Sequence, residues 1–146
     1  MQIRWPVATA VILAGLVLLA EQTAEKYQAR LATVAMDASM RSTIAGAGSA
    51  SGALSANHLT ISGTFEGLRS PAIAAKIHRG RVTGVRGPAI FDLTVSAATS
   101  GDISGVVELT ADQIDDLRKG RLYLQIDSER AREGNLWGWF LRSADF

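Results

Sequence analysis

Residues 65–95 read FEGLRSPAIAAKIHRGRVTGVRGPAIFDLTV and contain two strand-like runs, residues 71–78 and 89–95. The connecting residues 79–88 hold glycines and a proline, which predict an irregular loop rather than a tight hairpin. Apolar and polar residues alternate in each run, so one face of each strand can be buried and the other wetted. The expected buried set is Ile73, Ala75, Ile77, Phe91, Leu93 and Val95. Lys76 and His78 then lie side by side on the outer face, where we expect any chemistry.

Short strands continue on both sides of this stretch. Alternating apolar residues occur in residues 59–65, 103–109, 122–126 and 136–140. Thr110 and Gln113 have the spacing of a capping box, which predicts a short helix that Gly120 ends. The small residues at 45–53 indicate either a closely packed strand or a mobile loop. Together these patterns predict an all-β fold, an antiparallel sandwich or barrel of about seven or eight strands with one short helix.

Several motifs in the same order make the chain closely resemble the CHRD domain, first described in chordin and common in secreted or membrane-attached bacterial proteins. The segments that carry the resemblance are SGTFEGLRSPAIAAKIHRG, GPAIFDLTV, SGDISGVVELTADQIDDLRKGRLYLQIDSE and GNLWGWF, between about residue 31 and residue 140. The resemblance implies an all-β extracytoplasmic domain and implies less about molecular activity.

The chain departs from the histidine pattern of that family. Members typically read A-H-I-H-x-G, N-I-H-T and G-E-[IL]-R-G, where this chain reads AKIHRG, QIDS and GNLWG. The resemblance implies a set of three imidazoles, suited to copper or zinc, at positions 76, 78 and 127. Lys76, His78 and Asp127 stand there, so His78 and Asp127 remain as metal candidates and we expect no metal or cofactor. Lys76 can instead pair with Asp127 across adjacent strands.

Composition narrows the possible functions further. The 146 residues have a net charge of +1, which gives no general attraction to nucleic acid, and no cysteine, which excludes disulfides and thiolate metal sites. Arg79, Arg81 and Arg86 form a basic group that Glu66, Glu129 and Glu133 are expected to neutralise. Asp115 and Asp116 are expected on a solvated helix face. With two histidines, neither in a nucleophile motif, we expect no enzymatic activity.

Residues 5–20, WPVATAVILAGLVLLA, follow Arg4 and carry no charge, so they predict either a cleaved signal peptide or an uncleaved membrane anchor. Leu18 stands where a cleavage site needs a small residue, which favours the anchor. The positive-inside rule then places the N-terminus in the cytoplasm and the rest in the periplasm of a bacterium, in a single-pass inner-membrane protein. The anchor residues are Trp5, Val11, Leu13, Leu16 and Leu19. We expect an anchor and juxtamembrane helix or linker over residues 1–28 and a CHRD-like domain over residues 29–146.

The last strand predicts a contact surface. Leu136, Gly138 and Phe140 are expected to face the core, which leaves Trp137, Trp139 and Leu141 outside, with Tyr123 exposed on the neighbouring strand. Aromatic surfaces of this kind mark protein interfaces, although a terminal segment can also pack back over its own domain.

These patterns favour a non-enzymatic accessory or assembly subunit of a larger membrane protein complex, of respiratory or photosynthetic type. Such a subunit contacts other subunits and the lipid bilayer, and no nucleic acid. The alternatives are a periplasmic domain that binds copper or zinc, and a secreted adhesion module.

Overall fold

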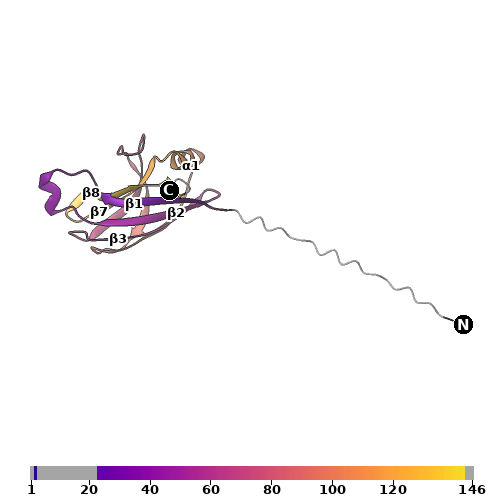
Figure 1. Ribbon diagram of the computed structural model, residues 1–146, viewed down its shortest axis with the longest axis horizontal. Coiled ribbons are helices and arrows are strands. Elements are labelled where there is room, and N and C mark those ends of the chain that lie inside the picture. The colour runs from indigo at the N-terminus through magenta and orange to yellow at the C-terminus, as the bar shows by residue number, and fades with distance from the viewer. Residues whose placement is uncertain (1, 3–22, 144–146) are drawn as a thin grey trace.

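A computed structural model describes residue 2 and residues 23–143, in which strands β1 to β8 close into an antiparallel barrel (Figure 1). The order around the sheet is β2-β3-β6-β5-β4-β7-β8-β1-β9, and pairing of β1 with β2 completes the closure. The strands are β1 (Glu25–Thr33), β2 (Ala47–Ser55), β3 (His58–Glu66), β4 (Ala72–Arg79), β5 (Ala89–Val95), β6 (Gly101–Glu108), β7 (Leu122–Ser128), β8 (Ala131–Trp139) and β9 (Leu141–Arg142). The helices are a 3-10 turn, η1 (Ala38–Ser42), and α1 (Ala111–Arg118). The expected antiparallel all-β fold with one short α-helix is confirmed.

The interior of the barrel is apolar because alternate residues of each strand point inward. Its largest fully buried apolar side chains include Tyr27, Phe140, Leu31, Leu59, Ile61, Ile77, Ile103, Leu122, Leu124 and Ile126. The inward faces predicted for residues 59–65, 103–109 and 122–126 are therefore confirmed. Groups that can bind or react are to be sought on the outer face of the sheet.

One local prediction about the strands is wrong. Ile73 is exposed rather than buried, because the pairing of β4 with β7 shifts register between Ala72 and Ala74. The turn between β7 and β8 contains only Glu129 and Arg130, since β8 begins at Ala131.

The small-residue segment forms strand β2 and lies between β1 and β3, so the mobile-loop interpretation is wrong. A Cβ on Gly48 would collide with the backbone carbonyl of Thr64. Because Gly48 has no side chain, the backbones of β2 and β3 can approach closely, as the packed-strand interpretation requires.

Strand β1 begins at Glu25, so residues 25–28 belong to the barrel rather than to a helix or linker. The reason is that Tyr27 continues the inward alternation of Ala29 and Leu31. Within the described residues, no helix has the length and apolar character needed to cross a membrane. The expected anchor residues Trp5, Val11, Leu13, Leu16 and Leu19 lie outside the described part of the chain.

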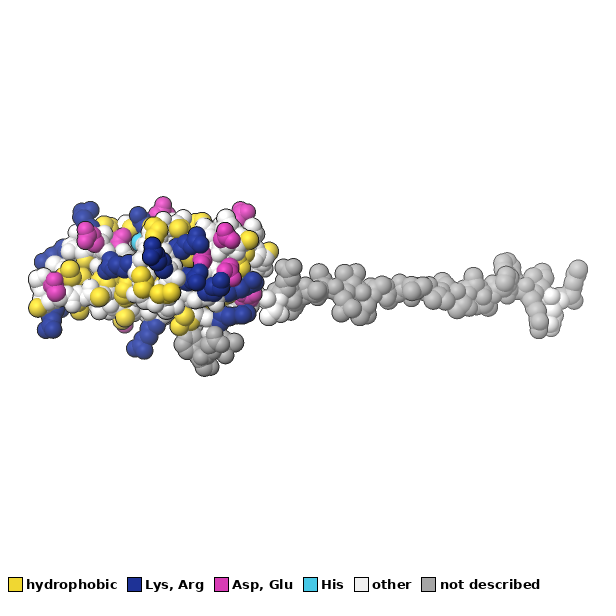
Figure 2. Space-filling view, turned by 90° about the horizontal axis from the view of Figure 1, so that it is seen from above, with side chains coloured by type: hydrophobic (Ala, Val, Ile, Leu, Met, Phe, Trp, Pro, Cys, Tyr) yellow, Lys and Arg dark blue, Asp and Glu magenta, His cyan; other side chains and the backbone are white. Residues whose placement is uncertain are grey.

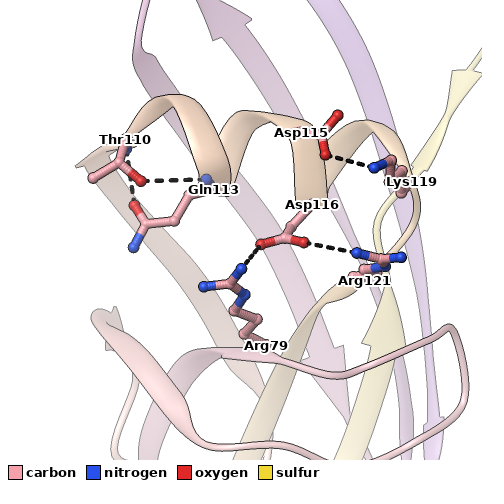
Figure 3. A network of polar contacts seen from close by, with 7 residues as sticks. All are labelled: Arg79, Thr110, Gln113, Asp115, Asp116, Lys119 and Arg121. Atoms are coloured by element: carbon pink, nitrogen blue, oxygen red, sulfur yellow. Dashed lines mark hydrogen bonds and ion pairs between the residues drawn. The ribbon is translucent and has the colours of Figure 1, made fainter.

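Helix α1 is fixed at its start and in its middle (Figure 3). The predicted capping box is present: the Gln113 amide donates to Thr110 Oγ1 at 3.2 Å, and the Thr110 amide donates to Gln113 Oε1 at 2.9 Å. Asp116 is only 3% exposed, so its expected position on a solvated face is wrong. It forms ion pairs with Arg79 at 2.6 Å and Arg121 at 3.4 Å, which tie the helix to the barrel.

Candidate functional site

Aromatic side chains from three adjacent strands form a row on the outer face of the barrel. His78 on β4 is paired with Tyr123 on β7, which is paired with Trp139 on β8. The ring centroids of His78 and Tyr123 are 4.9 Å apart and stacked, and those of Tyr123 and Trp139 are 4.3 Å apart. Trp137 makes edge contacts with both Tyr123 and Trp139. Cross-strand register therefore assembles residues that are distant in sequence.

The loop between β4 and β5, residues 80–88, folds over part of this row. Tyr123 Oη accepts a hydrogen bond from the Gly87 amide at 3.0 Å and donates to the Gly87 carbonyl at 3.1 Å. His78 Nδ1 lies 3.0 Å from the same carbonyl oxygen. Tyr123 is consequently 1% exposed, and its prediction as an exposed interface residue is wrong. The reason is that the loop covers Tyr123, and the alternation of residues within β7 does not predict this cover.

The uncovered end of the row continues into exposed aliphatic residues, and we call Trp137, Trp139, Leu141, Val82 and Val85 the aromatic surface. Both tryptophans are partly exposed, while Leu141, Val82 and Val85 are 39%, 53% and 46% exposed. A Cβ on Gly80 would meet both the Trp139 ring and the Val85 carbonyl, so the loop and β8 are in contact. The outward orientation predicted for Trp137, Trp139 and Leu141 is confirmed.

Figures 1 and 2 show the setting of this loop. The loop and α1 lie at the top of Figure 1, so Figure 2 looks down onto them. On this face, hydrophobic side chains are interspersed with those of Lys and Arg. Asp and Glu side chains also lie on this face, so the apolar side chains are surrounded by charges of both signs.

Polar residues lie beside the aromatic row on β7. Gln125 Nε2 donates to Asp127 Oδ1 at 2.8 Å and to the Glu133 carbonyl at 3.3 Å. Burial raises the pKa of Asp127, although the Gln125 hydrogen bond and the nearby cations oppose the rise. Lys76 contacts Asp92 at 3.9 Å, so the structure gives no support to its expected pairing with Asp127. The register explains this, because Lys76 lies opposite Asp92 on β5 and opposite Gln125 on β7.

The residues at the implied histidine positions do not fit a metal. Position 76 holds a cation, the Asp127 carboxylate accepts from Gln125, and His78 is stacked on Tyr123 with Nδ1 at the Gly87 carbonyl. Over residues 23–143, no group of three or more His, Asp or Glu side chains is arranged to hold an ion. His78 Nε2 is buried without a hydrogen-bond partner among the described residues, but a single imidazole beside a cation and a hydrogen-bonded carboxylate does not make a metal centre.

Two arginines of the expected basic group, Arg79 and Arg86, have different partners and do not act as one group. Arg79 is neutralised by Asp116, and the structure records no ion pair from Arg79 or Arg86 to Glu66, Glu129 or Glu133. Arg86 lies over the Trp137 ring, with Cζ 5.4 Å from its centroid, and donates to the Glu133 carbonyl at 3.1 Å. This cation contact extends the aromatic surface toward the start of β8.

The protein is thus a small antiparallel β-barrel domain. Its interior is apolar, and a row of aromatic and histidine side chains lies on its outer face. The model of the CHRD domain matches residues 27–139, and the chain belongs to that family. Neither the curated proteins nor the solved structures give a significant match to this chain.

Proposed function

We propose that this protein is a non-enzymatic accessory or assembly subunit of a larger membrane protein complex of respiratory or photosynthetic type. Its N-terminal segment anchors it in the bacterial inner membrane with the N-terminus in the cytoplasm. Its CHRD domain lies in the periplasm and docks onto other subunits.

The observation that carries this proposal is the aromatic surface. Val82, Val85 and Leu141 are exposed, both tryptophans are partly exposed, and Arg86 lies over the ring of Trp137. Trp and Arg are among the residues most enriched at the energetic centres of protein interfaces. Apolar side chains that stay in water are unfavourable, so this group of exposed residues on the loop and the last two strands favours a partner.

The histidines also favour binding over catalysis. His78 is engaged with the Gly87 carbonyl and the Tyr123 ring, and His58 is exposed at the start of β3. Within the described residues, neither has a hydrogen-bonded hydroxyl or carboxylate in the arrangement that activates a nucleophile. The fold satisfies Nδ1 of His78, whereas its buried Nε2 has no hydrogen-bond partner there.

Purification of the tagged full chain from its native membrane in mild detergent tests the proposal. We expect several other subunits to co-purify with the wild-type chain. Val85→Asp and Leu141→Asp place a charge in the aromatic surface and should reduce the co-purifying subunits about tenfold or more. Purification of the wild-type chain as a lone monomer would contradict the proposal.

Val106→Asp is the matched control, because Val106 is 64% exposed and lies on β6, away from the loop and β8. This variant adds the same charge and should retain all subunits. Equal loss in all three variants would assign the effect to net charge rather than to the aromatic surface. Melting temperatures of the three proteins separate loss of docking from loss of folding.

A further inference from the structure

A groove of about 380 Å³ lies beside the aromatic surface, between the segment that follows β1 and the first residues of β8. Its lining comes from residues 34–44, from residues 130–134 and from Arg86. The volume is within the range of sites that bind small ligands or single side chains. His78, Tyr123 and Trp139 of the aromatic row do not line this groove.

The floor of the groove is apolar. Val34, Ile44 and Ala131 are buried together in a small cluster that is separate from the main core, and Trp137 packs against it. Met40, on η1, is exposed at the groove. An aliphatic side chain placed here would exchange water for apolar contacts.

The rim of the groove is cationic. Arg86, Arg130 and Arg132 line it, with Glu133 as the acidic residue among the lining. Within residues 23–143, no carboxylate forms an ion pair with any of these three arginines. Guanidinium groups bind carboxylates through paired hydrogen bonds, so the rim is complementary to an acidic ligand.

The backbone at the groove is also incompletely paired. The last contacts of β1 with β8 are Thr33 with Leu136 and the hydrogen bond from the Val34 amide to the Asn135 carbonyl. Beyond this point the chain leaves β8 to form η1, so residues 131–134 have no β1 partner along that edge. The Glu133 carbonyl already accepts hydrogen bonds from Arg86 and Gln125, so an extended peptide would pair with the other backbone groups of this segment.

We infer that the groove binds an extended acidic peptide segment of a partner protein, with a carboxylate on the arginine rim and a neighbouring aliphatic side chain on the floor. The inference rests on the proposed docking function and names the chemistry of the partner. A free small acid fits less well, because Arg130, Arg132 and Met40 are exposed and leave such a ligand largely in water.

A lipid headgroup also fits less well than a peptide. The groove lies next to η1, at the end of the barrel opposite to the one at which residues 23–25 enter β1 (Figure 1). An anchor that precedes β1 would hold this end away from the bilayer. Peptide segments of neighbouring periplasmic subunits are therefore the ligands within reach.

The test uses the full chain and short acetylated, amidated peptides that contain a central Glu-Leu pair. Binding is measured by titration of chemical shifts. We expect shift changes at Val34, Ile44 and Ala131, and binding weaker by about fivefold or more for peptides with Gln-Leu or Glu-Ala in place of Glu-Leu. Equal binding of the three peptides, shift changes elsewhere, or no binding of the Glu-Leu peptide would overturn the inference.

The double variant Arg130→Gln, Arg132→Gln removes two rim charges and should weaken binding of the Glu-Leu peptide about tenfold. The double variant Arg69→Gln, Arg81→Gln is the matched control, because both arginines are exposed but do not line the groove. Unchanged binding in the double variant would also overturn the inference. If peptides fail while Val85→Asp still abolishes co-purification, the groove assignment falls and the docking function stands.

Discussion

Among single residues, Asp127 is notable because its carboxylate is partly buried on the outer face and accepts a hydrogen bond from Gln125. Burial raises its pKa in the folded state above its ordinary value of 3.8. The folded state therefore holds this proton more tightly than the unfolded state does. Its contribution to stability is present at acidic pH and is lost as the pH rises through the raised pKa.

Asp127→Asn should therefore raise stability at neutral pH, since the neutral amide avoids the burial penalty and its oxygen can still accept from Gln125. We expect a melting temperature higher by about 2 °C at pH 7, with the difference disappearing at acidic pH. Calorimetry at both pH values measures it. A lower melting temperature at pH 7 would mean that attraction by Lys76, His78 and Arg86 outweighs burial.

The inward or outward orientation of side chains could be predicted from the sequence wherever one face of a strand is exposed to solvent. Leu59, Ile61 and Ile103 are buried as their alternation predicts. Tyr123 and Gln125 are buried against prediction because a loop and the neighbouring strand cover the outer side of β7. Alternation identifies two faces but does not identify what later covers the second one.

At the scale of an element, α1 depends on Asp116, whose buried carboxylate joins Arg79 and Arg121. Asp116→Asn leaves both guanidiniums without their anion, although both can reach water. We expect a loss of about 1–3 kcal/mol in the free energy of unfolding, measured by urea denaturation.

Asp115→Asn is the matched control for that prediction on the same helix. Asp115 pairs with Lys119 at 2.7 Å in the exposed i,i+4 arrangement, which contributes little. The free energy of unfolding should change little, and by clearly less than in Asp116→Asn, because this pair is exposed to solvent. Equal losses in the two variants would refute the anchoring role of Asp116.

The loop of residues 80–88 is a second element that depends on one side chain. Tyr123→Phe removes the hydroxyl that bonds both backbone groups of Gly87. We expect a loss of about 1–2 kcal/mol and faster amide exchange at Gly87, followed by hydrogen exchange. Thr83, whose Oγ1 donates to the Gly120 carbonyl at 2.7 Å, provides a comparison, because Thr83→Val should loosen the other end of the loop. Unchanged exchange at Gly87 in Tyr123→Phe would show that the hydroxyl does not hold the loop.

Elements with strong local signals could be predicted, and those with ambiguous ones could not. The capping box of Thr110 and Gln113 located α1 because both of its hydrogen bonds are local. The start of β1 was missed because Tyr27 and Leu31 fit helical spacing as well as alternation. Only the long-range pairing of β1 with β2 resolves that ambiguity.

For the whole molecule, the barrel could be predicted from repeated alternation and short connections, but most of the proposed binding surface could not. The outward tryptophans of β8 were predictable within one strand. The groove depends on Arg86, Arg130 and Ile44 meeting from three segments distant in sequence. Their meeting is set by barrel closure and loop geometry, which no local pattern encodes.

An ion-pair cluster at Glu25 joins the first and last strands of the domain. Arg118 donates two hydrogen bonds to its carboxylate, at 2.7 Å and 3.2 Å, and Tyr27 Oη donates one at 2.7 Å. Arg142 of β9 lies 3.9 Å away. The cluster therefore links β1, α1 and β9.

The Arg118 hydrogen bonds, followed by the one from Tyr27, lower the pKa of Glu25 below its ordinary value of 4.5. Stability from this group is thus complete above pH 4.5 and is lost as the pH falls through the lowered pKa. Burial, the largest cause, raises the pKa of Tyr27 to about 12, so its contribution is lost as the pH rises above 10.0.

Glu25→Gln should reduce stability at pH 7 by about 0.5–1 kcal/mol, because the pair is partly solvated, and should flatten the loss of stability as the pH falls below 4.5. Arg118→Gln should flatten the same limb, and the double variant should add little to either single change, since both remove one interaction. Urea denaturation across this pH range measures all four proteins. Additive losses in the double variant, or an acid limb as steep as that of the wild type, would show that Glu25 and Arg118 do not act together in holding the first strand to the helix.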